Sequence, residues 1–199
     1  MNIDKKDWIN NILETMSNTD FVKAGDIPNI PLYMDQVTTF MDANLESTKR
    51  HEDDKILTKT MINNYTKNKL LPPSEKKKYS SEHILMLIFI YYLKSFLSIT
   101  DIQDILKPIS DKYFNRKGQY SLQEVYERIV AAEEAQNQSN KEDIRAKYEK
   151  SLEIFADAQE EDKDYMQMFT FICLLSYDVY TKKQLIESIV DQFSSEKKQ

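Results

Sequence analysis

The sequence predicts an all-α protein, and three observations support this fold class. The 199 residues contain only two Gly and five Pro, and strand-rich folds need many turns, so this scarcity favours helices. Apolar residues recur at spacings of three and four along most of the chain. Ser or Thr stands just before several of these apolar patterns, where helices begin. With 41% hydrophobic and 30% charged residues, the composition is typical of a globular domain with a charged surface.

The first two helices are expected over residues 4–18 and 32–45. Asp4 is expected to cap the first one, whose apolar stripe is Trp8, Ile12, Leu13 and Met16. Between the two helices, "GDIPNIP" at 25–31 is rich in helix breakers and predicts a linker. The polar stretch 46–55 then predicts a loop.

Three more helices are expected before residue 110. Thr58 caps a short helix that ends before the Pro72–Pro73 pair, since proline cannot continue a helix. Ser80 or Ser81 opens a long apolar helix that runs to about residue 96. Ser98 and Asp101 form a capping-box pair that opens the next helix, which Pro108 is expected to end.

The C-terminal half predicts several shorter helices. Ser121 and Glu124 form a capping box, "AQNQSNKED" at 135–143 predicts a polar break, and Thr181 with Gln184 predicts a new helix start. The segment 165–177 is apolar nearly all round, so it belongs in a bundle core, an apolar ligand pocket or a dimer interface. Cys173 within it is expected to be an inert core residue. Three parts are predicted: 1–28, an N-terminal helix and linker; 29–110, a helix-turn-helix module; and 111–199, a helical bundle for dimerisation or sensing.

The groups that enzymes need are scarce. His51, His83 and the single Cys173 have no metal-ligand spacing, and two Gly cannot form a phosphate-binding loop, so no enzyme activity, metal or cofactor is expected. The acidic runs at 51–54 and 160–164 predict solvated surface. The longest apolar run, 84–93, is too short to span a bilayer. One Cys and the absence of a signal-peptide pattern favour the cytoplasm.

One short window has the opposite charge to the rest of the chain. Seven Lys and a single acid lie between residues 55 and 79, a net charge of +6. The other 20 basic and 32 acidic residues leave −12 elsewhere. A basic patch on an acidic protein directs a polyanion to that patch, because the remaining surface repels it.

The order of motifs around this window resembles the DNA-binding domain of MerR-type regulators, a winged helix-turn-helix. In that family the second helix ends in a tyrosine and a "GLLPP"-like turn, followed by a basic wing and two helix starts. The matching residues are Tyr65, "LLPP" at 70–73, "YSSEHI" at 79–84 and "LSITDI" at 97–102. The wing would be a stub, since only "SEKKK" separates the prolines from Tyr79. The chain is also similar to the bacterial family called domain of unknown function 1836, a label that implies no activity.

The resemblance and the residue pattern together predict double-stranded DNA as the partner. A recognition helix at 58–67 would bury Met61, Ile62 and Tyr65 and expose polar residues that read bases. The wing at 74–79 would meet phosphates. The candidate DNA-binding residues are Lys59, Thr60, Asn63, Asn64, Lys67, Lys76, Lys77, Lys78 and Tyr79, although Tyr79 is expected to be a packing residue whichever function holds.

A homodimer is expected, since one short module gives little affinity and palindromic sites mirror protein symmetry. A small-molecule or protein effector at the C-terminal region is left open. The alternative function is a non-catalytic protein-interaction module with a degenerate helix-turn-helix.

Overall fold

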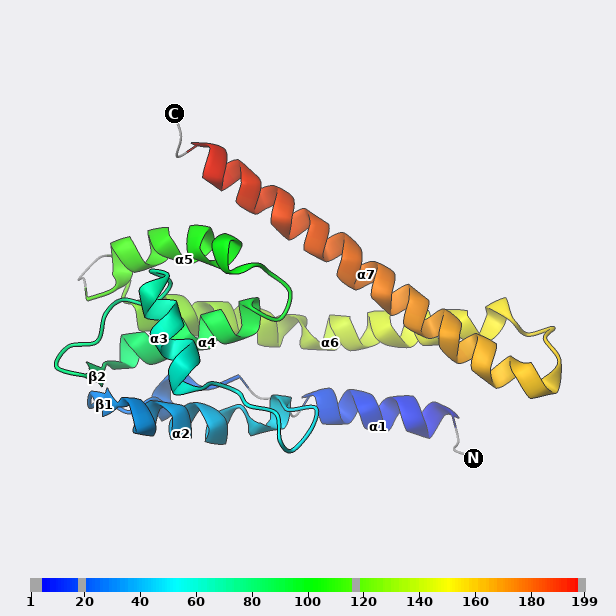
Figure 1. Ribbon diagram of the computed structural model, residues 1–199. Coiled ribbons are helices and arrows are strands. Elements are labelled where there is room, and N and C mark those ends of the chain that lie inside the picture. The colour runs from blue at the N-terminus through cyan, green and yellow to red at the C-terminus, as the bar shows by residue number, and fades with distance from the viewer. Residues whose placement is uncertain (1–4, 18–20, 116–118, 197–199) are drawn as a thin grey trace. The chain divides into compact units, whose positions relative to one another are not determined.

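The computed structural model describes residues 5–17, 21–115 and 119–196 and confirms the all-α prediction (Figure 1). Seven α-helices, two 3₁₀ helices and one two-stranded sheet lie within these ranges. The helices are α1 (Lys5–Ser17), α2 (Met34–Asn44), α3 (Lys59–Lys67), α4 (Ser81–Leu93), α5 (Ile99–Tyr113), α6 (Leu122–Ile154) and α7 (Glu160–Glu196). The strands are β1 (Leu32–Tyr33) and β2 (Lys78–Tyr79), and the 3₁₀ helices are η1 (Ala24–Asp26) and η2 (Glu46–Thr48). Across the described ranges, no helix combines the length and apolar character that a bilayer crossing requires.

The chain forms two compact units, and the two longest helices contribute to both. Unit 1 contains residues 1–18 and 132–189, and unit 2 contains residues 19–131 and 190–199.

Unit 2 is built around α4, which is apolar on every side. Residues 83–88 and Ile90 are all buried, so neighbouring elements must cover the whole circumference of this helix. One cover is α6, whose Tyr126 ring meets the Phe89 ring of α4 edge to face at 5.5 Å. The Tyr126 hydroxyl also donates a 2.6 Å hydrogen bond to the carbonyl of Val22 in the N-terminal connection. Burial of about six large apolar side chains on one helix stabilises the unit by roughly 10 kcal/mol before entropy is subtracted.

The long connection between α2 and α3 is anchored on the C-terminal end of α4. The Thr48 hydroxyl bonds the Tyr91 hydroxyl, and the Lys94 ammonium donates to the Ile56 carbonyl at 3.1 Å. The same ammonium lies 4.8 Å from the centre of the Tyr91 ring. Burial lowers the pKa of Lys94. These contacts fix the segment that precedes α3, although it is longer than a tight turn.

Unit 1 contains α1 and the parts of α6 and α7 within 132–189. Its core is Ile9, Leu13, Tyr148 and Phe171, with Trp8, Ile144, Leu152, Met168 and Leu175 packed around it. The Lys147 ammonium of α6 bonds Asp143 and reaches Asp178 of α7 at 2.9 Å, and each interaction raises the pKa of Lys147. Cys173 is exposed on α7, so the prediction that it is a core residue was wrong.

Two predicted helix boundaries in the C-terminal half were wrong. Residues 135–143 lie inside α6, which continues to Ile154, because Ala, Gln, Glu and Lys are good helix formers even without an apolar stripe. Gln138 and Glu142 bond across one turn at 2.9 Å. Thr181 lies inside α7, where its hydroxyl donates to the Tyr177 carbonyl at 3.0 Å instead of capping a new helix.

The predicted starts of the other helices agree more closely with the structure. Thr58, Ser80 and Ser98 are the N-caps of α3, α4 and α5, and Ser121 bonds Glu124 before α6. In α1, Ile9 is buried although the predicted stripe omitted it. The proposed cap Asp4 and the Met16 side chain lie outside the described residues.

Pro108 does not end a helix, contrary to the prediction. The residue lies inside α5, which continues to Tyr113. Its ring is exposed, so it meets solvent instead of a packed neighbour. A proline in a helix interior cannot donate a hydrogen bond to the carbonyl four residues earlier.

Replacing Pro108 should therefore stabilise the protein. We expect Pro108→Ala to raise the free energy of unfolding by about 2 kcal/mol, after allowing for the greater freedom of the unfolded chain. Thermal denaturation should show a rise of roughly 4–8 °C in Tm. The neighbouring Lys107→Ala serves as control and should change Tm by less than about 2 °C, since it removes only an exposed ion pair. A Tm for Pro108→Ala at or below that of the wild type would contradict this account of α5.

Candidate nucleic-acid interface

The short helix α3 has the two faces that the sequence predicts. The Thr58 hydroxyl caps it by accepting a 3.2 Å bond from the Met61 amide. Ile62 and Tyr65 are buried, and burial raises the pKa of Tyr65. The opposite face carries polar side chains that are exposed: Lys59, Thr60, Asn63, Asn64 and Lys67. All five are residues that the sequence nominated for DNA contact.

At its C-terminal end, α3 closes with a Schellman motif. The Leu70 amide bonds the Tyr65 carbonyl at 2.9 Å, and the Lys69 amide bonds the Thr66 carbonyl at 3.1 Å. This motif needs a left-handed residue, usually Gly, but Lys69 occupies it with φ of 57°. Leu70 and Leu71, which follow, are buried. The chain thus leaves α3 with an exposed lysine in a conformation that disfavours any side chain.

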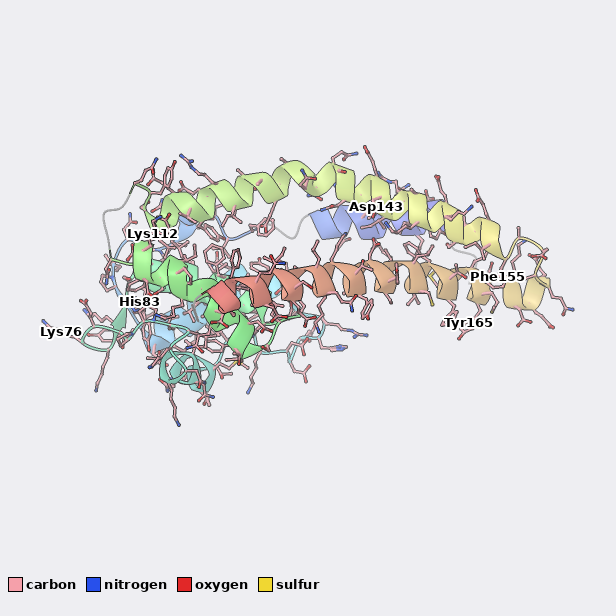
Figure 2. The ribbon with its side chains drawn as sticks, turned by 90° about the horizontal axis from the view of Figure 1, so that it is seen from above. Lys76, His83, Lys112, Asp143, Phe155 and Tyr165 are labelled. Carbon is pink, nitrogen blue, oxygen red and sulfur yellow. The ribbon has the colours of Figure 1, made fainter. Side chains whose placement is uncertain are left out.

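The basic stub forms a tight β-hairpin. Glu75 and Lys78 exchange backbone hydrogen bonds of 3.1 and 2.9 Å, which leaves Lys76 and Lys77 as the two central residues. Their φ angles are 49° and 63°, and positive φ at both positions is the mark of a type I′ turn. Figure 2 shows Lys76 at the outer end of this loop, with its side chain directed away from the helices. Both lysines are exposed.

The base of the hairpin is tied to the start of α2. Strands β1 and β2 pair antiparallel, with Leu32 opposite Tyr79 and Tyr33 opposite Lys78. The Lys78 ammonium lies 5.0 Å from the centre of the Tyr33 ring. This pairing connects the residues before α2 with the loop after α3, and so holds the basic hairpin and α3 within one unit.

The candidate DNA-binding residues differ in whether their side chains are already paired or buried. Lys59 is paired with Asp35 at the surface, and Lys78 is partly buried against Tyr33. Tyr79 is only 5% exposed, and its ring meets the His83 ring edge to face at 5.4 Å. Tyr79 therefore packs beneath the hairpin and does not present its ring to a ligand.

His83 connects the hairpin to the central helix. Its Nδ1 accepts hydrogen bonds from the Ser80 amide at 3.0 Å and from the Ser80 hydroxyl at 2.8 Å. The proton must then be on Nε2, which lies 3.3 Å from the Pro73 carbonyl and donates to it. The ring also meets Phe114 edge to face at 4.8 Å. Burial lowers the pKa of His83, although the Pro73 and Pro72 carbonyls act in the opposite direction.

Sequence reasoning missed two residues of this surface. Lys69 was not nominated, although it stands at the position that Gly holds in the "GLLPP"-like turn of MerR-type regulators, which residues 69–73 resemble. Asp35 was not considered, because its pairing with Lys59 joins residues 24 positions apart in sequence. The surface offers ammonium and amide groups for binding phosphate and base edges. Within the described ranges, no three His, Cys, Asp or Glu side chains gather as metal ligands do.

The capping role of His83 predicts a pH-dependent stability. Because its folded pKa lies below the ordinary value of 6.5, neutral His83 adds stability above about pH 6.5, which is lost as pH falls through the folded pKa. Urea unfolding at pH 7.5 and 5.0 should show this loss. His83→Gln should lower the pH dependence, since Gln can fill the same capping-box position without titrating.

The matched control is His51→Gln, which removes the other histidine, an exposed one. That variant should keep the pH dependence of the wild type. If His83→Gln and His51→Gln show the same loss between pH 7.5 and 5.0, another group is responsible and His83 does not cause the pH dependence.

Comparison with known proteins identifies a family. The family described as "Domain of unknown function (DUF1836)" matches residues 22–129, which include α2 to α5, both strands and the start of α6. No curated protein and no solved structure matches the chain. Since the match covers more than half of the 199 residues, the chain belongs to the DUF1836 family.

Proposed function

We propose that residues 29–110 form a MerR-like winged helix-turn-helix module that binds double-stranded DNA, and that the protein is a transcriptional regulator. In this proposal α3 is the recognition helix and the hairpin at 75–78 is the wing. The proposal follows from the exposed polar face of α3, the basic hairpin and the contact of both with α2.

The observation that carries the proposal is that exposed lysines occupy most of the backbone positions with positive φ. Of the four non-Gly residues with positive φ in the described ranges, three are exposed lysines that follow α3 or form the hairpin tip: Lys69, Lys76 and Lys77. Gly or Asn would adopt these conformations with less strain, by about 1 kcal/mol per residue. Strain retained at exposed cations is a reason to infer binding of an anion.

Base reading is assigned to α3. Its nine residues form about two and a half turns, and a helix with its side chains is about 10–12 Å across, which fits the major groove width of about 12 Å. Asn63 and Asn64 can each form two hydrogen bonds with adenine, and Lys67 can reach guanine or phosphate. Lys59 forms an ion pair with Asp35, and both side chains are exposed. Such a pair is weak, so Lys59 can exchange Asp35 for a phosphate.

Phosphate binding is assigned to the lysines outside the reading face. Lys69, Lys76 and Lys77 carry no acidic partner among the ion pairs of the described residues. With Lys59 and Lys67 they would neutralise roughly four to six phosphates. The acidic remainder of the chain would disfavour DNA elsewhere. A two-fold dimer would place two such modules on a palindromic site.

Fluorescence anisotropy tests this proposal. The purified protein is titrated into a duplex from upstream of its own gene and into a scrambled duplex, at about 50 and about 200 mM salt. We expect preferential binding of the upstream duplex and a loss of about 10²–10³-fold in affinity between the two salt concentrations. Absence of binding to either duplex at low salt would reject the proposal and favour a protein-interaction module.

The first variant tests recognition of bases separately from contact with phosphates. Asn63→Ala should reduce the preference for the upstream duplex by about 10–100-fold while leaving binding of the scrambled duplex nearly unchanged. Lys107→Ala with Lys150→Ala serves as the charge control for replacement of Lys76 and Lys77, because it removes two exposed lysines of other helices. The control should leave both affinities within about threefold of the wild type if binding is confined to the proposed face.

The hairpin lysines allow stability and binding to be tested against each other. Replacing Lys76 and Lys77 by Asn and Gly should raise the free energy of unfolding by about 1 kcal/mol, because this pair adopts a type I′ turn readily. The same variant should lower the slope of log affinity against log salt by about 2. Urea unfolding and the anisotropy titration give the two values. A variant that is more stable and binds DNA as the wild type does would remove the hairpin from the proposed interface.

A further inference from the structure

The α7 segment of unit 1 is covered on one face only. Gln167, Phe171 and Leu175 face the core, where Gln167 donates a 2.7 Å bond to the Leu152 carbonyl of α6. The opposite face is apolar but exposed: Tyr165 is 70% exposed, Phe169 50%, Ile172 54% and Val179 64%. Figure 2 shows Tyr165 on the side of α7 that faces away from α6.

These exposed residues follow a heptad repeat. Asp162, Tyr165, Phe169, Ile172, Ser176, Val179 and Lys183 alternate at spacings of three and four, and all seven are exposed. This alternation is the pattern of a seam between two paired helices. We call these seven residues the α7 seam. An ordinary solvent-facing helix surface does not keep four large apolar side chains in such a register.

We propose that the α7 seam is the interface with a second copy of this chain, in which the two α7 helices pair antiparallel. This inference is independent of DNA binding, because it depends only on the surface of unit 1.

The area is sufficient for a pair of identical surfaces. At roughly 150–250 Å² for a large side chain, the exposed parts of the four apolar seam residues and of the adjacent Tyr180 amount to about 500 Å². Two copies would thus bury about 1,000 Å² from these residues alone, which reaches the range of specific interfaces.

The charges of α7 favour the same chain as the partner and fix the direction of pairing. Its first turn is acidic, with Glu160, Glu161 and Asp162, whereas Lys182 and Lys183 lie near the other end of the seam. An antiparallel pair centred near residues 172–174 brings each acidic end alongside the lysines of the second copy. A parallel pair would place acid against acid and lysine against lysine. Lys183 pairs with Glu187 at 3.4 Å within its own helix, an exposed pair that is weak and exchangeable.

Light scattering coupled to size-exclusion chromatography tests the interface on the full chain without DNA. We expect a dimer at concentrations of tens of micromolar, and Ile172→Lys should weaken association at least about 100-fold, because it buries a charge in the seam. Ile30→Lys is the matched control, since Ile30 is 67% exposed and belongs to unit 2. A monomeric wild type, or a dimer that Ile172→Lys leaves intact, would overturn the proposal.

A charge exchange tests the antiparallel direction. Asp162→Lys should weaken dimerisation about 10-fold by placing lysines opposite Lys183 of the second copy, and adding Lys183→Asp should restore it. A parallel pair would predict little change in either variant, so equal dimerisation of all three proteins would overturn the antiparallel assignment. Since no DNA is present, the result is separate from the outcome of the anisotropy titration.

Discussion

The burial of α4 is the constraint on which the rest of unit 2 depends. A helix that is apolar on every side cannot be stable at a surface, so other elements must cover it, among them the long connection to α3 and the start of α6. The two ends of α4 also fix the segments on which the proposed function rests. At its start, Ser80 and His83 hold the hairpin base, and at its end Tyr91 and Lys94 hold the connection that leads into α3. A rigid, dry core thereby positions a polar, exposed surface.

The strain at that surface is consistent with a binding role. Lys69, Lys76 and Lys77 keep side chains in backbone conformations that glycine adopts freely. The fold tolerates them because neighbouring contacts determine the chain path: the Schellman hydrogen bonds after α3, and the β1–β2 pairing below the hairpin tip. The strain of such positions is offset by the core, and the ammonium groups remain available to solvent.

The two units present surfaces of different chemistry. Unit 2 carries the exposed lysines and asparagines of α3 and the hairpin, which suit a polyanion. Unit 1 carries the α7 seam, whose uncharged apolar centre and oppositely charged ends suit a copy of itself. The helix α7, which carries the seam in unit 1, also contributes to unit 2, where its Val190 is buried.

The sequence by itself determined the helical class, most helix starts and both faces of α3. Each of these follows from local rules: Thr58, Ser80 and Ser98 satisfy free amides at helix starts, and the three-to-four spacing of Ile62 and Tyr65 places them on one side. These local rules were wrong at four places. Residues 135–143 and Thr181 stayed helical within long helices, Pro108 was accommodated at an exposed position, and Cys173 remained outside because only one face of α7 is covered. The left-handed lysines, the position of Tyr79 beneath the hairpin and the link from His83 to Pro73 were decided only in the folded structure, since the Schellman hydrogen bonds, the pairing of Leu32 with Tyr79 and the hydrogen bond to Pro73 set a chain path that residue propensities do not predict.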